Sequence, residues 1–165
     1  MTSELVWHAN TGDWDSTLRA GGKSIGSLRF EASLKRAAGE IDGRKWTFEH
    51  HDSIAHPNIT IHADGATEPA AIFDYRITGG GAVSFRNGVR YRWTPNFAGS
   101  LTFCFRREGE KGRVCVTEEP PSTRGSRVQV CSEAADQPET PVLILLGWFL
   151  QVQIYEQFLE SLVAW

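Results

Sequence analysis

The chain has 165 residues, a length that fits one domain with a sizeable hydrophobic core. Hydrophobic residues make up 41% of it and charged residues 22%, the ordinary balance of a soluble globular protein. The 17 basic and 20 acidic residues give a net charge of -3, so a general nucleic-acid binder, which needs a basic surface, is not expected.

The first half of the chain alternates apolar and polar residues between glycine-containing turns, a pattern that is typical of short β-strands. Trp46 and Phe48 are expected on one buried face, and Ile59 and Ile61 on another, after a loop at 51–57. The stretch 34–41 also resembles a helix start, but its glycines favour a strand. The strands expected here are 5–8, 16–20, 23–30, 34–41, 45–50, 58–63 and 70–78.

The Asn87-Gly88 pair marks a hairpin between two strands with alternating apolar residues. A two-residue turn would place Val89 on the polar face, because the pairing register fixes the face of every side chain. A three-residue loop from Arg86 to Gly88 instead pairs Phe85 with Val89 and keeps the apolar side chains together. We therefore predict a type I turn with Gly88 in the left-handed conformation, closing a bulge.

Further strands are expected near 101–105, 114–116 and 128–130, which brings the count before residue 141 to roughly ten to twelve. The segment 118–126 contains two adjacent prolines and is interpreted as a mobile loop, and 132–140 as an acidic linker. A β-barrel or a double-sheet wrap accommodates this number of short strands, and no second-domain boundary is found.

The segment 141–165 is the only long stretch without strand-breaking turns, and we predict a helix there. Its first part, 142–150, has nine residues and no charged or polar side chain, so protein or lipid must surround it. A membrane span needs about twenty apolar residues, and polar residues return from Gln151 onward. These features favour a core helix inside the barrel, with a membrane anchor as the alternative.

The three cysteines fall in expected strands without a close Cys-x-x-Cys pair. Reduced thiols of a cytosolic protein are therefore expected rather than a zinc site. The N-terminal residues have neither a basic region nor an apolar run, so no signal peptide is expected. The predicted location is the cytoplasm, with peripheral attachment to a membrane as a further option.

The succession of many short strands and one very hydrophobic helix resembles the layout of the tubby C-terminal-like superfamily, which includes tubby, LURP-one-related and phospholipid scramblase proteins. The segment 71–93 resembles LURP-one-related members in its Asn-Gly hairpin and Tyr-x-Trp return, and 142–150 resembles the core helix. The resemblance implies one domain over 1–165, a closed antiparallel barrel of about twelve strands around a central hydrophobic helix. It also implies phosphoinositide or membrane-surface binding without enzymatic chemistry. The lipid-binding lysines and arginines of tubby proteins do not match position by position, so none is carried over.

One stretch of this acidic chain is basic. From Tyr75 to Arg107 there is no aspartate or glutamate, whereas six of the 17 basic residues lie there, all of them arginines. Clustered guanidinium groups suit phosphate or carboxylate recognition, although solvated side chains paired with acids of neighbouring strands would give the same pattern. The candidate anion-binding residues are Arg76, Arg86, Arg90 and Arg92.

The sequence predicts no catalytic residue, cofactor or metal site. It contains no dinucleotide-binding glycine motif followed by a helix, no P-loop and no Gly-x-Ser-x-Gly elbow. Four histidines occur close together near several acids, but their spacing matches no known zinc pattern, so loop and strand-end positions are the simpler interpretation. These histidines are His50, His51, His56 and His62.

The predicted function is a non-enzymatic binding module that recognises an anionic lipid headgroup or a protein partner through the outer wall of the barrel. The alternative is a small-molecule-binding or enzymatic barrel of the lipocalin type, with an open interior lined by Tyr75, Tyr91 and Trp93. A scaffolding subunit that self-associates is a third hypothesis. A helix inside the barrel would favour the first hypothesis over the second, because it would leave no room for a ligand.

Overall fold

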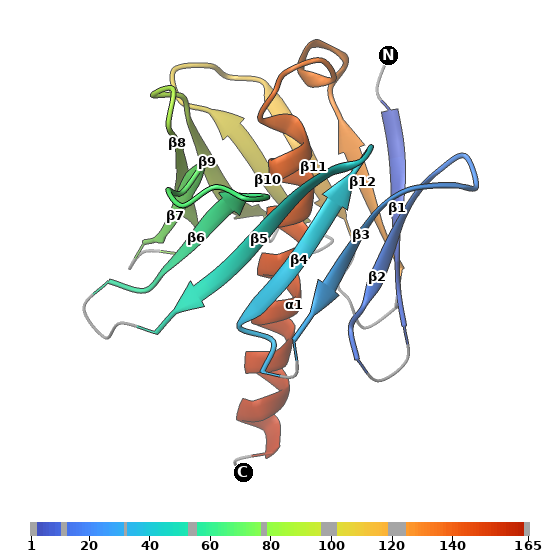
Figure 1. Ribbon diagram of the computed structural model, residues 1–165, viewed down its shortest axis with the longest axis vertical. Coiled ribbons are helices and arrows are strands. Elements are labelled where there is room, and N and C mark those ends of the chain that lie inside the picture. The colour runs from blue at the N-terminus through green and yellow to red at the C-terminus, as the bar shows by residue number, and fades with distance from the viewer. Residues whose placement is uncertain are drawn as a thin grey trace.

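The structure is a computed structural model that describes residues 3–10, 13–31, 33–52, 56–76, 79–96, 102–118 and 125–163. Within these residues, twelve antiparallel strands close into a barrel, and helix α1 (Thr140–Val163) runs through its middle (Figure 1). Strand β1 (Ser3–Ala9) pairs with β12 (Gly125–Val130) to complete the ring. The predicted closed barrel around a central hydrophobic helix is therefore confirmed.

The remaining strands follow one another as hairpins around the ring. The predicted bounds 16–20, 23–30 and 58–63 agree with three of them, and 34–41 is a strand that begins two residues later. The predicted linker contains a 3-10 helix, η2 (Ser132–Ala134), and most of the predicted loop 118–126 lies outside the described residues. The strands are β2 (Ser16–Ala20), β3 (Lys23–Phe30), β4 (Arg36–Ile41), β5 (Arg44–His51), β6 (Asn58–Ala63), β7 (Ala71–Tyr75), β8 (Gly81–Phe85), β9 (Arg90–Asn96), β10 (Thr102–Arg107) and β11 (Arg113–Glu118).

Alternation along the strands decides which side chains enter the core. The predicted inward pairs, Trp46 with Phe48 and Ile59 with Ile61, are all buried. Where β4 approaches the helix the inward position is a glycine, and a Cβ on Gly39 would lie only 2.9 Å from a methyl carbon of Leu145. A residue without a side chain therefore lets the helix pack against the wall at this point.

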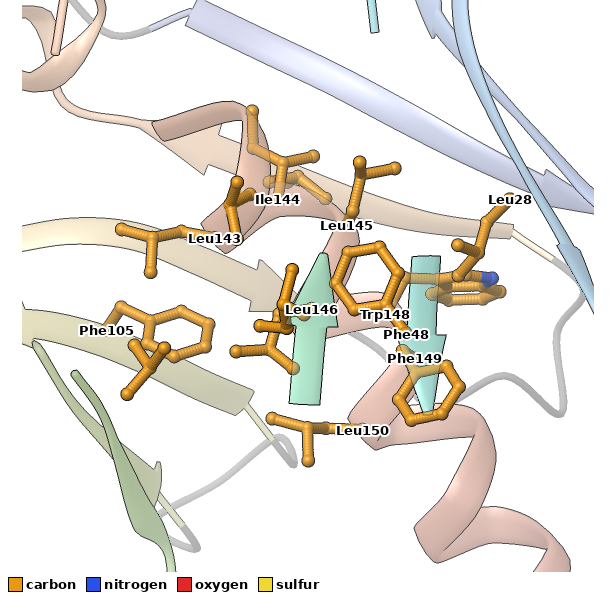
Figure 2. Close-up of a cluster of buried hydrophobic side chains, with 14 of the residues drawn as sticks. Leu28, Phe48, Phe105, Leu143, Ile144, Leu145, Leu146, Trp148, Phe149 and Leu150 are labelled. Atoms are coloured by element: carbon orange, nitrogen blue, oxygen red, sulfur yellow. The ribbon is translucent and has the colours of Figure 1, made fainter. Parts of the chain in front are cut away.

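Helix α1 is enclosed over its first three turns, because every residue from 142 to 153 is buried. Figure 2 shows its leucines, Trp148 and Phe149 packed among side chains from the surrounding strands. The indole ring of Trp148 stacks on that of Trp7, with 5.7 Å between ring centroids, and its N–H donates to the Ser16 hydroxyl at 2.8 Å. Both the apolar body and the polar atom of this tryptophan are thus accommodated inside the barrel.

The C-terminal end of α1 leaves the barrel and projects beyond the strands (Figure 1). Leu162 and Val163 are 57% and 86% exposed, whereas the helix interior is fully covered. At the exit, Trp14 donates its indole N–H to Glu156, so a loop of the barrel rim holds the departing helix. The predicted change from a fully enclosed to a partly enclosed helix is therefore observed.

By length and composition alone, α1 also satisfies the requirements for crossing a membrane. Its 24 residues include an 18-residue window with a mean hydropathy of 1.4, and 75% of that window is buried inside the protein. The core helix of a soluble protein meets the same criteria. Because the strands already cover its apolar surface, the structure supports the core-helix interpretation.

The hairpin between β8 and β9 has the predicted three-residue loop. The Phe85 N–H donates to the Val89 carbonyl at 2.8 Å, and the Gly88 N–H donates to the Phe85 carbonyl at 3.0 Å. Gly88 has a φ of +88°, the left-handed conformation that was predicted for it. The Asn87 side chain accepts from the Val89 N–H at 3.0 Å and donates to Glu139 at 3.1 Å, which ties the loop to the residue before α1.

Two of the cysteines have described side chains, and both are free thiols. Cys104 lies in β10 as expected, whereas Cys131 directly follows β12 rather than lying within a strand. The side chain of Cys115 lies outside the described part of the protein, although its backbone belongs to β11. The prediction of strand-embedded thiols therefore applies to two of the three backbone positions.

Replacing Leu145 by alanine should lower the free energy of unfolding by about 2–5 kcal/mol, because it leaves a cavity between the helix and β4. Leu162→Ala is the matched control, since the wild-type side chain is mostly exposed, and its effect should stay below about 0.5 kcal/mol. Urea denaturation of both variants measures the difference. Equal and small effects would contradict the placement of the helix inside the barrel.

Candidate functional site

The four arginines predicted to bind an anion do not form one cluster. Arg86, in the loop between β8 and β9, forms an ion pair with Glu68. Arg90 at the start of β9 places its Nε 3.5 Å from a carboxylate oxygen of Glu108. Arg76 follows β7, at the end of these strands opposite the Arg86 loop. Two of the four are thus paired with acids, as the simpler interpretation of the sequence anticipated.

The fourth arginine, Arg92, lies directly opposite Arg106 of β10. Both belong to the outward-facing set of their strands, since their neighbours Tyr91, Trp93 and Phe105 are buried. Like charges opposite each other on a sheet repel and lower stability. Within the described part of the chain, neither guanidinium has a carboxylate oxygen within 4.0 Å. The pair therefore has an electrostatic cost that no described acid offsets.

Arg106 also carries an unsatisfied donor. Its Nε is buried and has no hydrogen-bond partner among the residues that the structure describes. A buried donor that is left unpaired costs free energy, and more so when it belongs to a charged group. An anion that bridged the guanidinium groups of Arg92 and Arg106 would relieve the repulsion between them.

A hollow of about 540 Å³ lies on the outer wall at this pair. Two outward-facing residues near the pair are small and buried, Ala82 opposite Arg92 and Cys104 two residues before Arg106. Longer neighbouring side chains must therefore cover them. The small side chains at these two positions leave a depression in the outer surface of the sheet. The hollow is lined by Arg92, Thr94, Arg106, Arg107, Glu108, Gly109, Glu110 and Lys111.

The two acids at the hollow are directed toward other bases. Glu108 pairs with Arg90, and a carboxylate oxygen of Glu110 lies 3.9 Å from the Nε of Arg107. Lys111 in the β10–β11 turn has no ion pair among the residues that the structure describes. The positive charge that remains for a ligand is carried by Arg92, Arg106 and Lys111.

Two of these residues, Arg106 and Lys111, were not among the sequence candidates. Arg106 belongs to the acid-free stretch, but its position opposite Arg92 depends on the register across residues 97–101, which no sequence signal determines. Lys111 lies in a turn whose direction relative to the wall is equally undetermined by the sequence. Alternation along β9 places Arg92 on the outward face, and the pairing of β9 with β10 brings Arg106 beside it.

The histidine group does not converge on one point. His50 faces the core with its side chain 8% exposed, its Nδ1 3.1 Å from a carboxylate oxygen of Asp52, and its ring edge-on to Tyr75. His51 is directed outward, with its Nε2 2.9 Å from the Thr60 hydroxyl. Among the described residues, no group of three histidine, cysteine, aspartate or glutamate side chains could hold a metal ion.

The interior of the barrel contains α1 where a lipocalin-type barrel would hold its ligand (Figure 2). Tyr91 and Trp93, which were expected to line an open interior, are 1% and 3% exposed and belong to the packed core. Tyr75 is packed edge-on against Phe73, and burial raises the pKa of its hydroxyl. Among the described residues, α1 and the core side chains therefore occupy the space that the open-interior alternative assigns to a ligand.

The stability of the protein should fall as the pH drops through about 6.5, the ordinary pKa of histidine. Burial lowers the pKa of His50, opposed by the Asp52 carboxylate, and Lys35 and His51 lower it further. The unfolded chain therefore takes up a proton there more readily than the folded protein. Urea midpoints measured between pH 8 and pH 5 should decrease, and His50→Gln should reduce this dependence whereas His8→Gln should not. An unchanged dependence in His50→Gln would contradict the assignment.

Comparisons of this chain with protein-family models, with curated proteins and with solved structures gave no match. The fold stands on the structure itself, a barrel of twelve described strands around one helix. Membership in the tubby C-terminal-like superfamily stays a prediction, which rests on that layout and on the segments 71–93 and 142–150.

Proposed function

We propose that this protein is a non-enzymatic binding module that holds an anionic group on the outer wall of its barrel. The observation that supports this most strongly is the opposed pair of Arg92 and Arg106 beside a hollow of about 540 Å³. The two arginines do not contribute to packing of the core, which lies on the other face of both strands. Because α1 fills the interior, the outer wall and the rims are the surfaces left for a ligand.

The chemistry of the pair fits a phosphate or a carboxylate. A guanidinium group presents parallel N–H donors that match two oxygens of either anion. An anion between Arg92 and Arg106 would accept from the guanidinium groups of both. Lys111 adds a flexible charge at the edge of the hollow. Binding of the anion would therefore reduce the repulsion between the two arginines and form charge-assisted hydrogen bonds with both.

A site on the outer wall fits an anionic group of either of two molecules, a lipid headgroup or a protein partner. The resemblance to tubby-type proteins supports a lipid headgroup and peripheral attachment to a cytoplasmic membrane. The net charge of -3 means that attraction comes from the local arginines rather than from the whole protein. Such local attraction is screened within about 8–10 Å at ordinary salt, so binding by either source should weaken as salt is added.

Flotation with liposomes tests the lipid source. If a lipid headgroup is the source, the wild-type protein should float with vesicles of phosphatidylcholine that contain phosphatidylserine or phosphoinositide, and not with phosphatidylcholine alone. The double variant Arg92→Gln/Arg106→Gln should bind at least about tenfold more weakly, since each charge-assisted hydrogen bond contributes about 1.5–3 kcal/mol. Arg29→Gln is the matched control, because β3 lies six strands from β9 in the ring of twelve.

A soluble inositol phosphate and an acidic peptide serve as the other two probes. Binding of either that depends on Arg92 and Arg106, without flotation, would keep the anion site and exclude the lipid source. The proposal would be contradicted if none of the three probes bound the wild-type protein. It would equally be contradicted if the double variant bound as tightly as Arg29→Gln.

A further inference from the structure

A second hollow, of about 460 Å³, adjoins the first on the outer wall. The two hollows share Arg107 and Glu108, and the second is also lined by Arg90 and by the β8–β9 loop. The surface that they form together, from Arg90 through Arg92 to Arg106, is called the arginine groove below. A single phosphate or carboxylate held by Arg92 and Arg106 would leave the half at Arg90 without a ligand.

The spacing within the arginine groove follows from the strand. Arg90 and Arg92 are two residues apart on β9 and belong to the same outward-facing set. A strand rises about 3.3 Å per residue, so their Cα atoms are about 6.6 Å apart. Side chains at alternate positions of an extended peptide have this same repeat. Two acidic residues at alternate positions of an extended peptide would reach Arg90 and Arg92 at the same time. A single headgroup phosphate held at the first hollow would reach only Arg92.

Glu108 already occupies the second position. Its carboxylate pairs with Arg90 at 3.5 Å, and both side chains are 43% exposed. An ion pair with this exposure changes an equilibrium only about one- to fivefold. A carboxylate of a partner can therefore replace Glu108 at Arg90 with little loss of free energy. At Arg92 it would displace no acid of the described residues, because Arg92 has no ion pair among them.

On the basis of the function proposed above, we infer that the partner of the arginine groove is an extended acidic peptide with acids at alternate positions. One carboxylate lies between Arg92 and Arg106, and the next lies at Arg90. Glu108 acts as a competitor within the same chain, which weakens binding until the peptide displaces it. The first hollow supplies most of the affinity, and the second supplies the preference for alternating acids.

Fluorescence anisotropy at low salt can test this with two labelled peptides of equal composition. One is Thr-Glu-Thr-Glu-Thr-Glu-Thr, and the other carries its three glutamates in one block. The alternating peptide should bind at least about threefold more tightly. Arg92→Gln should weaken the binding of both peptides, whereas Arg90→Gln should remove the preference for the alternating one. Glu108→Gln should tighten the binding of the alternating peptide by up to about fivefold.

Glu40→Gln is the charge-matched control, because it removes one negative charge from β4, five strands away from β9 in the ring. An equal gain in Glu40→Gln would show a general charge effect and would overturn the role of Glu108. The absence of any preference between the peptides would overturn the inference. If vesicles or inositol phosphate still bound through Arg92 in that case, the anion-binding function would stand alone, and if no probe bound, both would fail.

Discussion

The enclosure of α1 is the constraint on which the rest of the structure depends. A helix with no polar side over residues 142–150 must be covered in every direction, and a single open sheet covers only one. A closed ring of strands meets this need and at the same time removes the unpaired sheet edges. Phe149 shows the result, since its ring lies 5.8 Å from both Phe30 and Phe48, which belong to different strands.

Because the interior is filled, the core and the candidate binding surface lie on opposite faces of the same barrel wall. On β9 the inward side chains Tyr91 and Trp93 belong to the core, and the outward Arg90 and Arg92 belong to the arginine groove. The strand alternation that buries the first pair therefore presents the second pair to solvent. The hairpin loop before β9 is in turn fixed to the helix start through Asn87 and Glu139. The candidate binding surface is thus positioned by the same packing that encloses the helix.

The sequence was sufficient for the features that depend on local patterns. Alternation identified the inward sets, and turn chemistry combined with parity determined the loop at Gly88. The long apolar run identified the central helix, because a helix that is apolar on every side must be covered by the surrounding strands. Fold class was therefore predictable, down to the conformation of one glycine.

Apart from the hairpin at Gly88, features that depend on register between strands were not predictable. The opposition of Arg92 and Arg106 requires the pairing of β9 with β10 across residues 97–101. An irregularity between Phe105 and Arg106 shifts the pairing of β10 with β11, so that Arg106 lies opposite Arg113. The ion pair between Arg90 and Glu108 also depends on cross-strand placement. These contacts are the ones that define the candidate site.

Hydrogen exchange of the α1 backbone tests the central claim most directly. If the barrel encloses the helix, amides of residues 144–152 should exchange only when the whole protein unfolds, at rates that follow the free energy of unfolding. Amides beyond residue 157 should exchange faster, because that part of the helix projects into solvent (Figure 1). Rapid exchange at 144–152 in water, with protection gained only after lipid vesicles are added, would show that lipid rather than the barrel covers the helix.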